Sequence, residues 1–144
     1  MNLLNQVKVL RALNAQTTAQ TATTGKAIDT KGFEGVLFIA VGSSLLCGAA
    51  AVLKCKTAAT TTGTFVSSNT KLTSTSLVTG GFNYKTLCLD VYRPLNRYVK
   101  PCVTGATSGT VRSLTAILYG ARRAGSSACE STQSVRKSIV AATS

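Results

Sequence analysis

Histidine and tryptophan are absent from the sequence, and only four of its 144 residues are acidic. General acid–base catalysis usually depends on histidine, or on two carboxylates whose pKa values are shifted by their surroundings. The four acids, Asp29, Glu34, Asp90 and Glu130, are spread along the chain, and only the first two lie close together in sequence. This inventory argues against an enzyme, so we expect no catalytic residues and no cofactor.

The absence of histidine also limits the kinds of metal site that the chain could build. The five cysteines form no C-x-x-C pair, and such pairs or histidines are the usual ligands of structural zinc, so we expect no bound metal. Cys47, Cys55, Cys88 and Cys102 lie in or beside apolar runs, which predicts that they are reduced and buried in the core. Cys129 lies in a polar segment and is expected to be exposed.

Acidic residues are far fewer than basic ones. The chain has 16 lysines and arginines against its four acids, which gives a formal net charge of +12. A charge of this size indicates an acidic partner or assembly. The acidic surface of another protein and the phosphates of a nucleic acid both fit this requirement.

Long apolar runs are scarce. One run, residues 36–53, has eighteen mostly apolar residues, which is close to the shortest length that spans a membrane. Glycine and serine at residues 42–44 and at Gly48 interrupt it, and β-branched and aromatic residues are concentrated in its first half. Two strands joined at residues 42–44 explain this composition better than a membrane helix does, so we expect no membrane association.

The first 27 residues divide into two parts. Apolar residues recur at three- and four-residue spacing at Leu3, Val7, Leu10 and Leu13, which predicts a short amphipathic helix. Residues 16–25 have no periodicity and no large apolar side chain, which predicts an extended arm that a neighbouring chain would order. We therefore assign residues 1–27 to an N-terminal arm.

Short strand patterns dominate from residue 29 onward, separated by clusters of threonine, serine, glycine and asparagine. Such clusters mark turns, and strands that recur about every ten residues without helices indicate a sandwich. The strand-like runs are residues 33–41, 50–56, 85–92, 97–104 and 111–123. We therefore predict an all-β, antiparallel sandwich over residues 28–123, followed by a C-terminal tail over residues 124–144.

One polar stretch, LDVYRPLNRYVKP, combines two arginines, two tyrosines and two prolines with strand-forming residues. Proline cannot donate to a strand ladder, so we expect Pro94 in a turn and Pro101 at an edge or a bulge. Arg93 and Arg97 flank this turn, and Asp90 is near enough in sequence to bind either of them. The two tyrosines are expected to be half-buried rings beside the turn.

Three motifs occur in an order and spacing that we can compare with a known family. They are D-T-x-G-F-E at residues 29–34, D-V-x-R-P-x-x-R-Y at residues 90–98 and I-x-Y-G-x-R at residues 117–122. Together they resemble the small decoration, or cement, proteins on the heads of tailed bacteriophages. The resemblance covers roughly residues 28–123.

The resemblance implies a jelly-roll-like sandwich with extended terminal arms that binds the outer surface of a phage capsid. Copies of such a protein bridge adjacent subunits of the major capsid protein, associate as homodimers or homotrimers, and stabilise the expanded head. It also implies a location on the capsid outer surface of the virion, after assembly in the cytoplasm of the host bacterium. On this basis we expect the capsid-facing charge at Arg93, Arg97, Arg122 and Arg123.

A nucleic-acid-binding coat protein of a small phage is the alternative, because the net charge of +12 also suits a phosphate backbone. The basic residues are dispersed, however, and the longest basic run is the pair Arg122–Arg123. Aromatic side chains that could stack on bases are few. These features favour a protein partner over nucleic acid.

Overall fold

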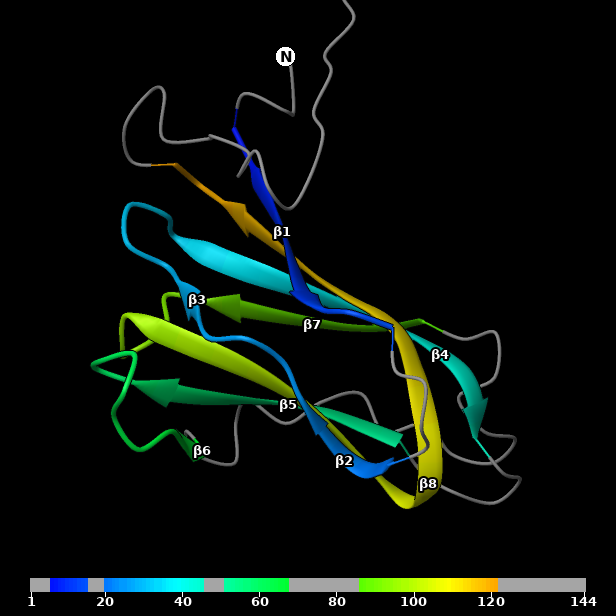
Figure 1. Cartoon of the computed structure of the whole chain (residues 1–144). Coiled ribbons are helices and arrows are strands. Elements are labelled where there is room, and N and C mark those ends of the chain that lie inside the picture. Colours follow the sequence, from blue (N-terminus) through cyan, green and yellow to red (C-terminus); the bar gives the residue numbers. More distant parts are fainter. Residues whose placement is uncertain (1–5, 16–19, 46–50, 68–85, 122–144) are drawn as a thin grey trace, which may run out of the picture.

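Every regular element that the structure describes is a β-strand (Figure 1). The computed structural model describes residues 6–15, 20–45, 51–67 and 86–121. The strands are β1 (Lys8–Leu13), β2 (Gln20–Thr24), β3 (Ile28–Asp29), β4 (Gly35–Leu45), β5 (Ala51–Ala58), β6 (Val66–Ser67), β7 (Thr86–Tyr92) and β8 (Tyr98–Tyr119). All their pairings are antiparallel. The predicted all-β class is confirmed, and these ranges hold no helix with the length and apolarity to cross a bilayer.

β8 is the central element because it pairs with strands in two layers. Its first half lies between β5 on one side and β2 and β3 on the other, while its second half lies between β4 and β1. β7 continues the sheet beyond β4, and β6 continues it beyond β5. Figure 1 shows β8 turning back on itself between its yellow-green and orange parts, so that one hydrogen-bonded sheet folds into two layers. We call β7–β4–β8–β1 the β4 layer, and β6–β5–β8 with β2 and β3 the β5 layer.

The bend in β8 coincides with glycine. Gly105 pairs with β5 and Gly109 pairs with β4, so the ladder passes from one layer to the other through the bend. Glycine inside a strand is typical of such a tight bend, although in a polar stretch it also resembles a turn. For this reason the sequence predicts two strands at residues 97–104 and 111–123, whereas the structure has one strand of 22 residues.

Glycine has a similar effect in β4. The two strands expected within residues 36–53 are present as β4 and β5. The expected junction at residues 42–44 is wrong, because β4 continues to Leu45 and accommodates Gly42 by register shifts on both sides of it. Residues 46–50, which separate the two strands, lie outside the described ranges.

Pro101 lies within the long central strand rather than at the edge of the sheet. In an antiparallel ladder, the N–H and C=O groups of one residue point to the same neighbour. The Pro101 carbonyl accepts a 2.8 Å hydrogen bond from the Gly25 amide, so the Pro101 nitrogen also faces the segment between β2 and β3. The register shifts by one residue between the Thr24–Cys102 and Ile28–Val99 pairs. The proline therefore faces an irregularity in the neighbouring strand, where no regular ladder bond is lost.

The helix expected near the N-terminus is wrong, because residues 8–13 form β1. Leu10 and Ala12 are buried while Arg11 is exposed, which is the two-residue alternation of a strand. Pairing with β8 supplies the backbone hydrogen bonds that a short isolated helix could not maintain. β2 also pairs with β8, so the described part of the expected N-terminal arm is ordered by its own chain rather than by a neighbour.

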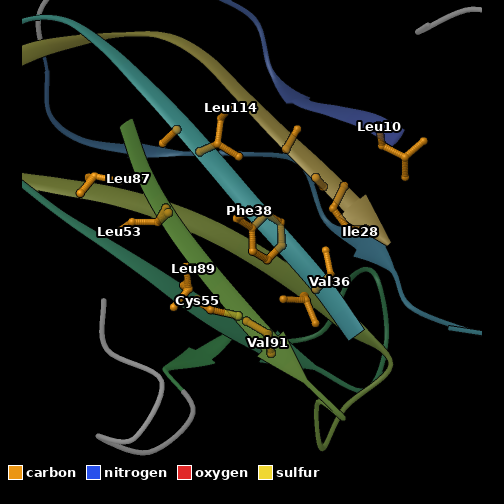
Figure 2. Packing of buried hydrophobic residues seen from close by; sticks show 14 of the residues in the cluster. Leu10, Ile28, Val36, Phe38, Leu53, Cys55, Leu87, Leu89, Val91 and Leu114 are labelled. Atoms are coloured by element: carbon orange, nitrogen blue, oxygen red, sulfur yellow. The ribbon is translucent and has the colours of Figure 1, made fainter. Parts of the chain in front are cut away.

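The core lies between the two layers and is built largely from small and β-branched side chains (Figure 2). From β4, Val36 and Phe38 point inward and are fully buried. Leu53 of β5 and Leu87 of β7 are buried as well, and Figure 2 shows them to one side of the Phe38 ring. Phe38 is the largest of the fully buried side chains, so it fills the centre of a core that has few aromatics.

Candidate protein-binding surface

Residues 93–97 form the turn that connects β7 to β8 at one end of the sandwich. Arg93 has a φ angle of 47°, a left-handed conformation that is uncommon for a residue other than glycine. Its amide donates a 2.8 Å hydrogen bond to the carbonyl oxygen of Glu34. A strained backbone conformation persists only where neighbouring contacts hold it. The shape of this turn is therefore imposed by its surroundings.

The strongest of these contacts joins Arg97 to Asp29, the last residue of β3. The Nε and Nη2 atoms of Arg97 donate to the two carboxylate oxygens of Asp29 at 2.8 and 2.6 Å. This two-pronged bond holds the pKa of Asp29 below its usual value. The Arg97 carbonyl also accepts bonds from the amide and hydroxyl of Thr30, at 3.0 and 2.7 Å. One end of the turn is thus fixed to the residues that follow β3.

Arg93 is held less tightly than Arg97. Its Nη2 atom lies 3.9 Å from the Glu34 carboxylate, and 65% of its side-chain surface is exposed. The guanidinium of Arg93 lies 5.1 Å from the ring centroid of Tyr92, and that of Arg97 lies 5.0 Å from the ring centroid of Tyr98. Both tyrosines lie beside the turn, as the sequence predicts, but only Tyr98 is half-buried, whereas Tyr92 is 55% exposed. Of the two arginines, Arg93 has the guanidinium more available to a partner.

The tip of the turn carries an apolar side chain that the sequence analysis did not single out. Leu95 is 90% exposed, more than either of the other exposed large hydrophobic residues in the described ranges. Beside it, the Asn96 side chain donates a 3.0 Å hydrogen bond to the hydroxyl of Thr57, which is buried in β5. Leu95 is therefore presented on a turn that is anchored directly behind it. The available signal was a leucine between a turn proline and a polar residue.

Asp90 has a different partner from the one expected. Its Oδ1 atom accepts a 2.6 Å hydrogen bond from the hydroxyl of Tyr119, while the acids beside the two arginines are Asp29 and Glu34. Tyr119 lies on the outer face of the β4 layer, where it passes over Gly35. Burial, together with the Asp90 hydrogen bond, raises the pKa of the Tyr119 phenol.

The three motifs that carry the resemblance meet at this end of the molecule. Residues 29–34 and 90–98 are joined by the Arg97–Asp29 and Arg93–Glu34 contacts. Residues 117–122 are joined to both, through the Tyr119–Asp90 bond and through the Glu34 amide, which donates to the Tyr119 carbonyl at 3.0 Å. Most of the motif residues therefore form a frame that shapes the turn. Among the motif side chains, those of Leu95 and Arg93 are strongly exposed, at 90% and 65%.

A second feature is the basic outer face of the β5 layer. Lys54 and Lys56 alternate with the buried residues Leu53 and Cys55 along β5. Lys56 pairs with Lys100 of β8, so these two lysines lie side by side on the same face. The Lys100 ammonium lies 4.4 Å from the ring centroid of Phe65, which positions the charge.

This basic face adjoins a groove of about 620 Å³, which we call the basic groove. It lies where β1 ends and the chain passes from β2 to β3. Arg11, Lys26 and Lys100 line it, together with neutral residues and without a carboxylate. The Lys26 amide donates a 2.7 Å hydrogen bond to the Ala12 carbonyl, which holds the two walls together. Such a groove suits an anionic ligand.

The predictions for Arg122, Arg123 and the five cysteines have different outcomes. Arg122 and Arg123 lie outside the described residues, as do Cys47 and Cys129. Cys55 and Cys102 are buried thiols as expected, and burial raises the pKa of Cys55 to about 12. The expected burial of Cys88 is wrong: it is exposed on the outer face of β7, because it falls out of phase with the buried Leu87 and Leu89.

Groups of acids and cysteines that could hold a metal ion do not occur in the part of the chain that the structure describes.

Comparisons with known proteins do not assign the chain to a family: it matches no protein-family model, no curated protein and no solved structure. Two surfaces of the described residues are therefore the candidates for function, the turn at residues 93–97 and the basic face of the β5 layer. Both are suited to binding, one through an exposed apolar tip beside an arginine and the other through lysines.

Proposed function

We propose that the chain is a virion structural protein without enzymatic activity, a cement protein that binds the outer surface of a phage capsid. In this role it would bridge adjacent major capsid protein subunits and stabilise the expanded head. The observation that carries the proposal is the braced turn, in which Leu95 is 90% exposed beside the Arg93 side chain. The resemblance of the three motifs to cement proteins supplies the kind of partner.

An exposed leucine beside an arginine is suited to a particular partner surface. Binding energy is concentrated in a few side chains that fill pockets on the partner, and arginine binds carboxylates with a planar fork. The matching surface on the capsid protein would therefore be an apolar depression with acidic residues at its rim. Because contacts behind the turn already fix its shape, little conformational entropy would be lost on binding.

Bridging would follow from the use of more than one surface. A single small contact gives modest affinity, since association itself has a large entropic cost. A second contact to a neighbouring subunit benefits from the high effective concentration that the first one creates. The basic face with Lys54, Lys56 and Lys100 lies on the β5 layer, apart from the tip at Leu95, and is available for that second contact. The expected contacts of Arg122 and Arg123 stay a prediction, as do the jelly-roll order of strands and the reach of the terminal tail.

The test uses heads purified from a phage that encodes the chain, produced with the gene for the chain deleted. Purified wild-type protein is added to these heads, and bound protein is measured by co-sedimentation and by electron microscopy. We expect saturable binding, and we expect Leu95→Asp to weaken it by roughly tenfold or more, because burying a leucine contributes about 1.5–3 kcal/mol. Arg93→Glu should weaken binding as well.

Arg112→Glu is the matched control for Arg93→Glu. Arg112 is an exposed arginine near the bend of β8, at the opposite end of the sandwich from the turn. Its reversal changes the net charge equally and should leave head binding unchanged. If purified virions lack the chain, or if wild-type protein does not bind the heads, the proposed function is wrong.

The basic groove favours a second candidate, the nucleic-acid-binding coat protein. Three cations line this groove without a carboxylate, which is suited to a phosphate backbone. Lys26→Glu combined with Lys100→Glu should then abolish binding to a generic single-stranded RNA, and the wild-type affinity should fall steeply with salt. Weak, salt-insensitive RNA binding together with strong head binding would exclude this candidate in favour of the cement role.

A further inference from the structure

The outer face of the β4 layer is apolar, in contrast to the lysine-bearing outer face of the β5 layer. Along β4, Val36, Phe38 and Ala40 point into the core. Because side chains alternate along a strand, the residues between them point outward. The outward aliphatic residues of this layer are Val9, Leu37, Ile39, Val41 and Ile117, and their side chains are half-buried.

The strand register places these residues in adjacent rows. Directly paired residues on antiparallel strands point to the same side of the sheet. One row across the layer is Val9, Ile117, Leu37 and Asp90, and the next is Arg11, Thr115, Ile39 and Cys88. The aliphatic residues therefore form one continuous area across β1, β8 and β4, and Asp90 and Cys88 of β7 lie along its edge. At one end this area is bordered by Tyr119 and Tyr92, which flank Gly35.

Such a face needs a partner to bury it. An antiparallel sheet with one side on the core normally carries polar residues on its other side, as the lysines of the β5 layer do. Contiguous apolar areas on a protein surface usually mark interaction sites. The tyrosines at the border are also residues that interfaces favour.

We propose that the outer face of the β4 layer is the contact between two copies of this chain, packed face to face about a two-fold axis. A second copy fits this face because two charged residues on it, one basic and one acidic, complement each other across a two-fold axis. Arg11 lies at the β1 edge and Asp90 at the β7 edge, in adjacent rows. A two-fold axis parallel to the strands sets β1 of each copy over β7 of the other. Each Arg11 then lies diagonally across from the partner's Asp90, and the arginine side chain is long enough to reach that carboxylate.

The hydrogen bond from Tyr119 prepares Asp90 for this role. It occupies one lone pair of Oδ1 and positions the carboxylate on the outer face. An ionised carboxylate can accept several hydrogen bonds, so it can bind an arginine at the same time. The same packing leaves both basic faces of the pair pointing outward, away from the contact.

The size of the face indicates the strength of the contact. Four strands about 4.8 Å apart, each with about seven residues at about 3.4 Å per residue, cover roughly 450 Å² on each copy. This is below the roughly 600–1,000 Å² per partner of standard specific interfaces, in the range of weak, transient contacts. We therefore expect a dimer with a dissociation constant in the micromolar range, which a shared attachment to a larger assembly would reinforce.

The test is the oligomeric state of the purified full chain in reducing buffer, measured by sedimentation equilibrium from about 1 to 300 micromolar. We expect a reversible monomer–dimer equilibrium. Ile39→Lys places a charge in the centre of the face and should raise the dissociation constant about tenfold or more. Lys54→Glu, on the outer face of the other layer, is the control and should leave the equilibrium unchanged.

Reversing the charges of Arg11 and Asp90 gives a second test of the dimer, which does not depend on whether Ile39→Lys folds. Arg11→Glu alone and Asp90→Arg alone should each weaken the dimer, and the double variant should restore it at least in part. A wild-type chain that stays monomeric over the whole range would overturn the proposal. So would a trimer, a dimer unaffected by Ile39→Lys in a folded variant, or a double variant no better than either single one. None of these measurements involves a capsid, so the result is independent of the proposed function.

Discussion

The hydroxyl of Tyr119 donates a 2.6 Å hydrogen bond to Asp90 across the backbone of Gly35. The three residues lie on β8, β7 and β4, and the bond therefore ties the two outer strands together over the middle one. This arrangement requires a residue without a side chain at position 35, because a Cβ atom there would overlap the Tyr119 hydroxyl.

Gly35→Ala should destabilise the protein. The added methyl group displaces the Tyr119 side chain and breaks its bond to Asp90, since backbone and side chains here are closely packed. We expect a loss of about 1–3 kcal/mol in the free energy of unfolding, as for other overpacked sites. Urea denaturation followed by circular dichroism measures this loss. Tyr119→Phe, which removes only the hydroxyl, is the comparison and should lose about 1 kcal/mol. Equal stability of Gly35→Ala and wild type would contradict the overlap.

The same bond predicts a stability change in alkali. Burial and the Asp90 carboxylate raise the pKa of Tyr119 above its usual value of 10.0 in the folded state. A raised folded-state pKa gives a contribution that is fully present below pH 10 and is lost as the pH rises toward the folded-state value. Wild-type stability should therefore fall above pH 10 more steeply than that of Tyr119→Phe. Parallel stability profiles of the two proteins above pH 10 would show that Tyr119 titrates normally.

The Asp29–Arg97 pair predicts the opposite dependence, in acid. The arginine lowers the pKa of Asp29 from 3.8, so its contribution is present above that value and is lost as the pH falls below it. Both side chains are partly exposed, and we expect the effect to be small and reduced by salt. Asp29→Asn should remove this part of the acid dependence, as measured by thermal unfolding between neutral pH and pH 3. Arg97→Lys keeps the charge but loses the fork, so it should retain only part of the effect. An unchanged acid profile in Asp29→Asn would argue against the pair.

Much of the fold follows from local patterns in the sequence. The alternation of Leu53 with Lys54 and of Leu87 with Cys88 defines strands and their faces, and this needs no knowledge of the partner strand. The turn between β7 and β8 follows from Pro94 in the same way. The helix expected at residues 3–13 failed because short segments satisfy more than one period, and pairing with β8 decided between them.

The site is harder to infer because its contacts join distant segments. Asp29 and Arg97 are separated by 68 residues, and Tyr119 and Asp90 by 29. Sequence proximity favoured Asp90 as the partner of the arginines, whereas the folding of β8 into two layers brings Asp29 and Glu34 to them instead. The exposure of Leu95 is likewise a result of how the turn is anchored, through Asn96 and the buried Thr57.

Leu37 and Phe38 are neighbours on β4 that point to opposite sides of the sheet, and their substitution should have different consequences. Phe38 is fully buried between the layers, so Phe38→Ala should lower the free energy of unfolding by about 3–5 kcal/mol. Leu37 is half-buried on the outer face, so Leu37→Ala should change the unfolding of dilute protein by less than about 1 kcal/mol while weakening self-association. Urea denaturation at low concentration and sedimentation equilibrium at high concentration separate the two effects. A large loss of stability for Leu37→Ala in dilute protein would show that its own chain, rather than a second copy, covers this face.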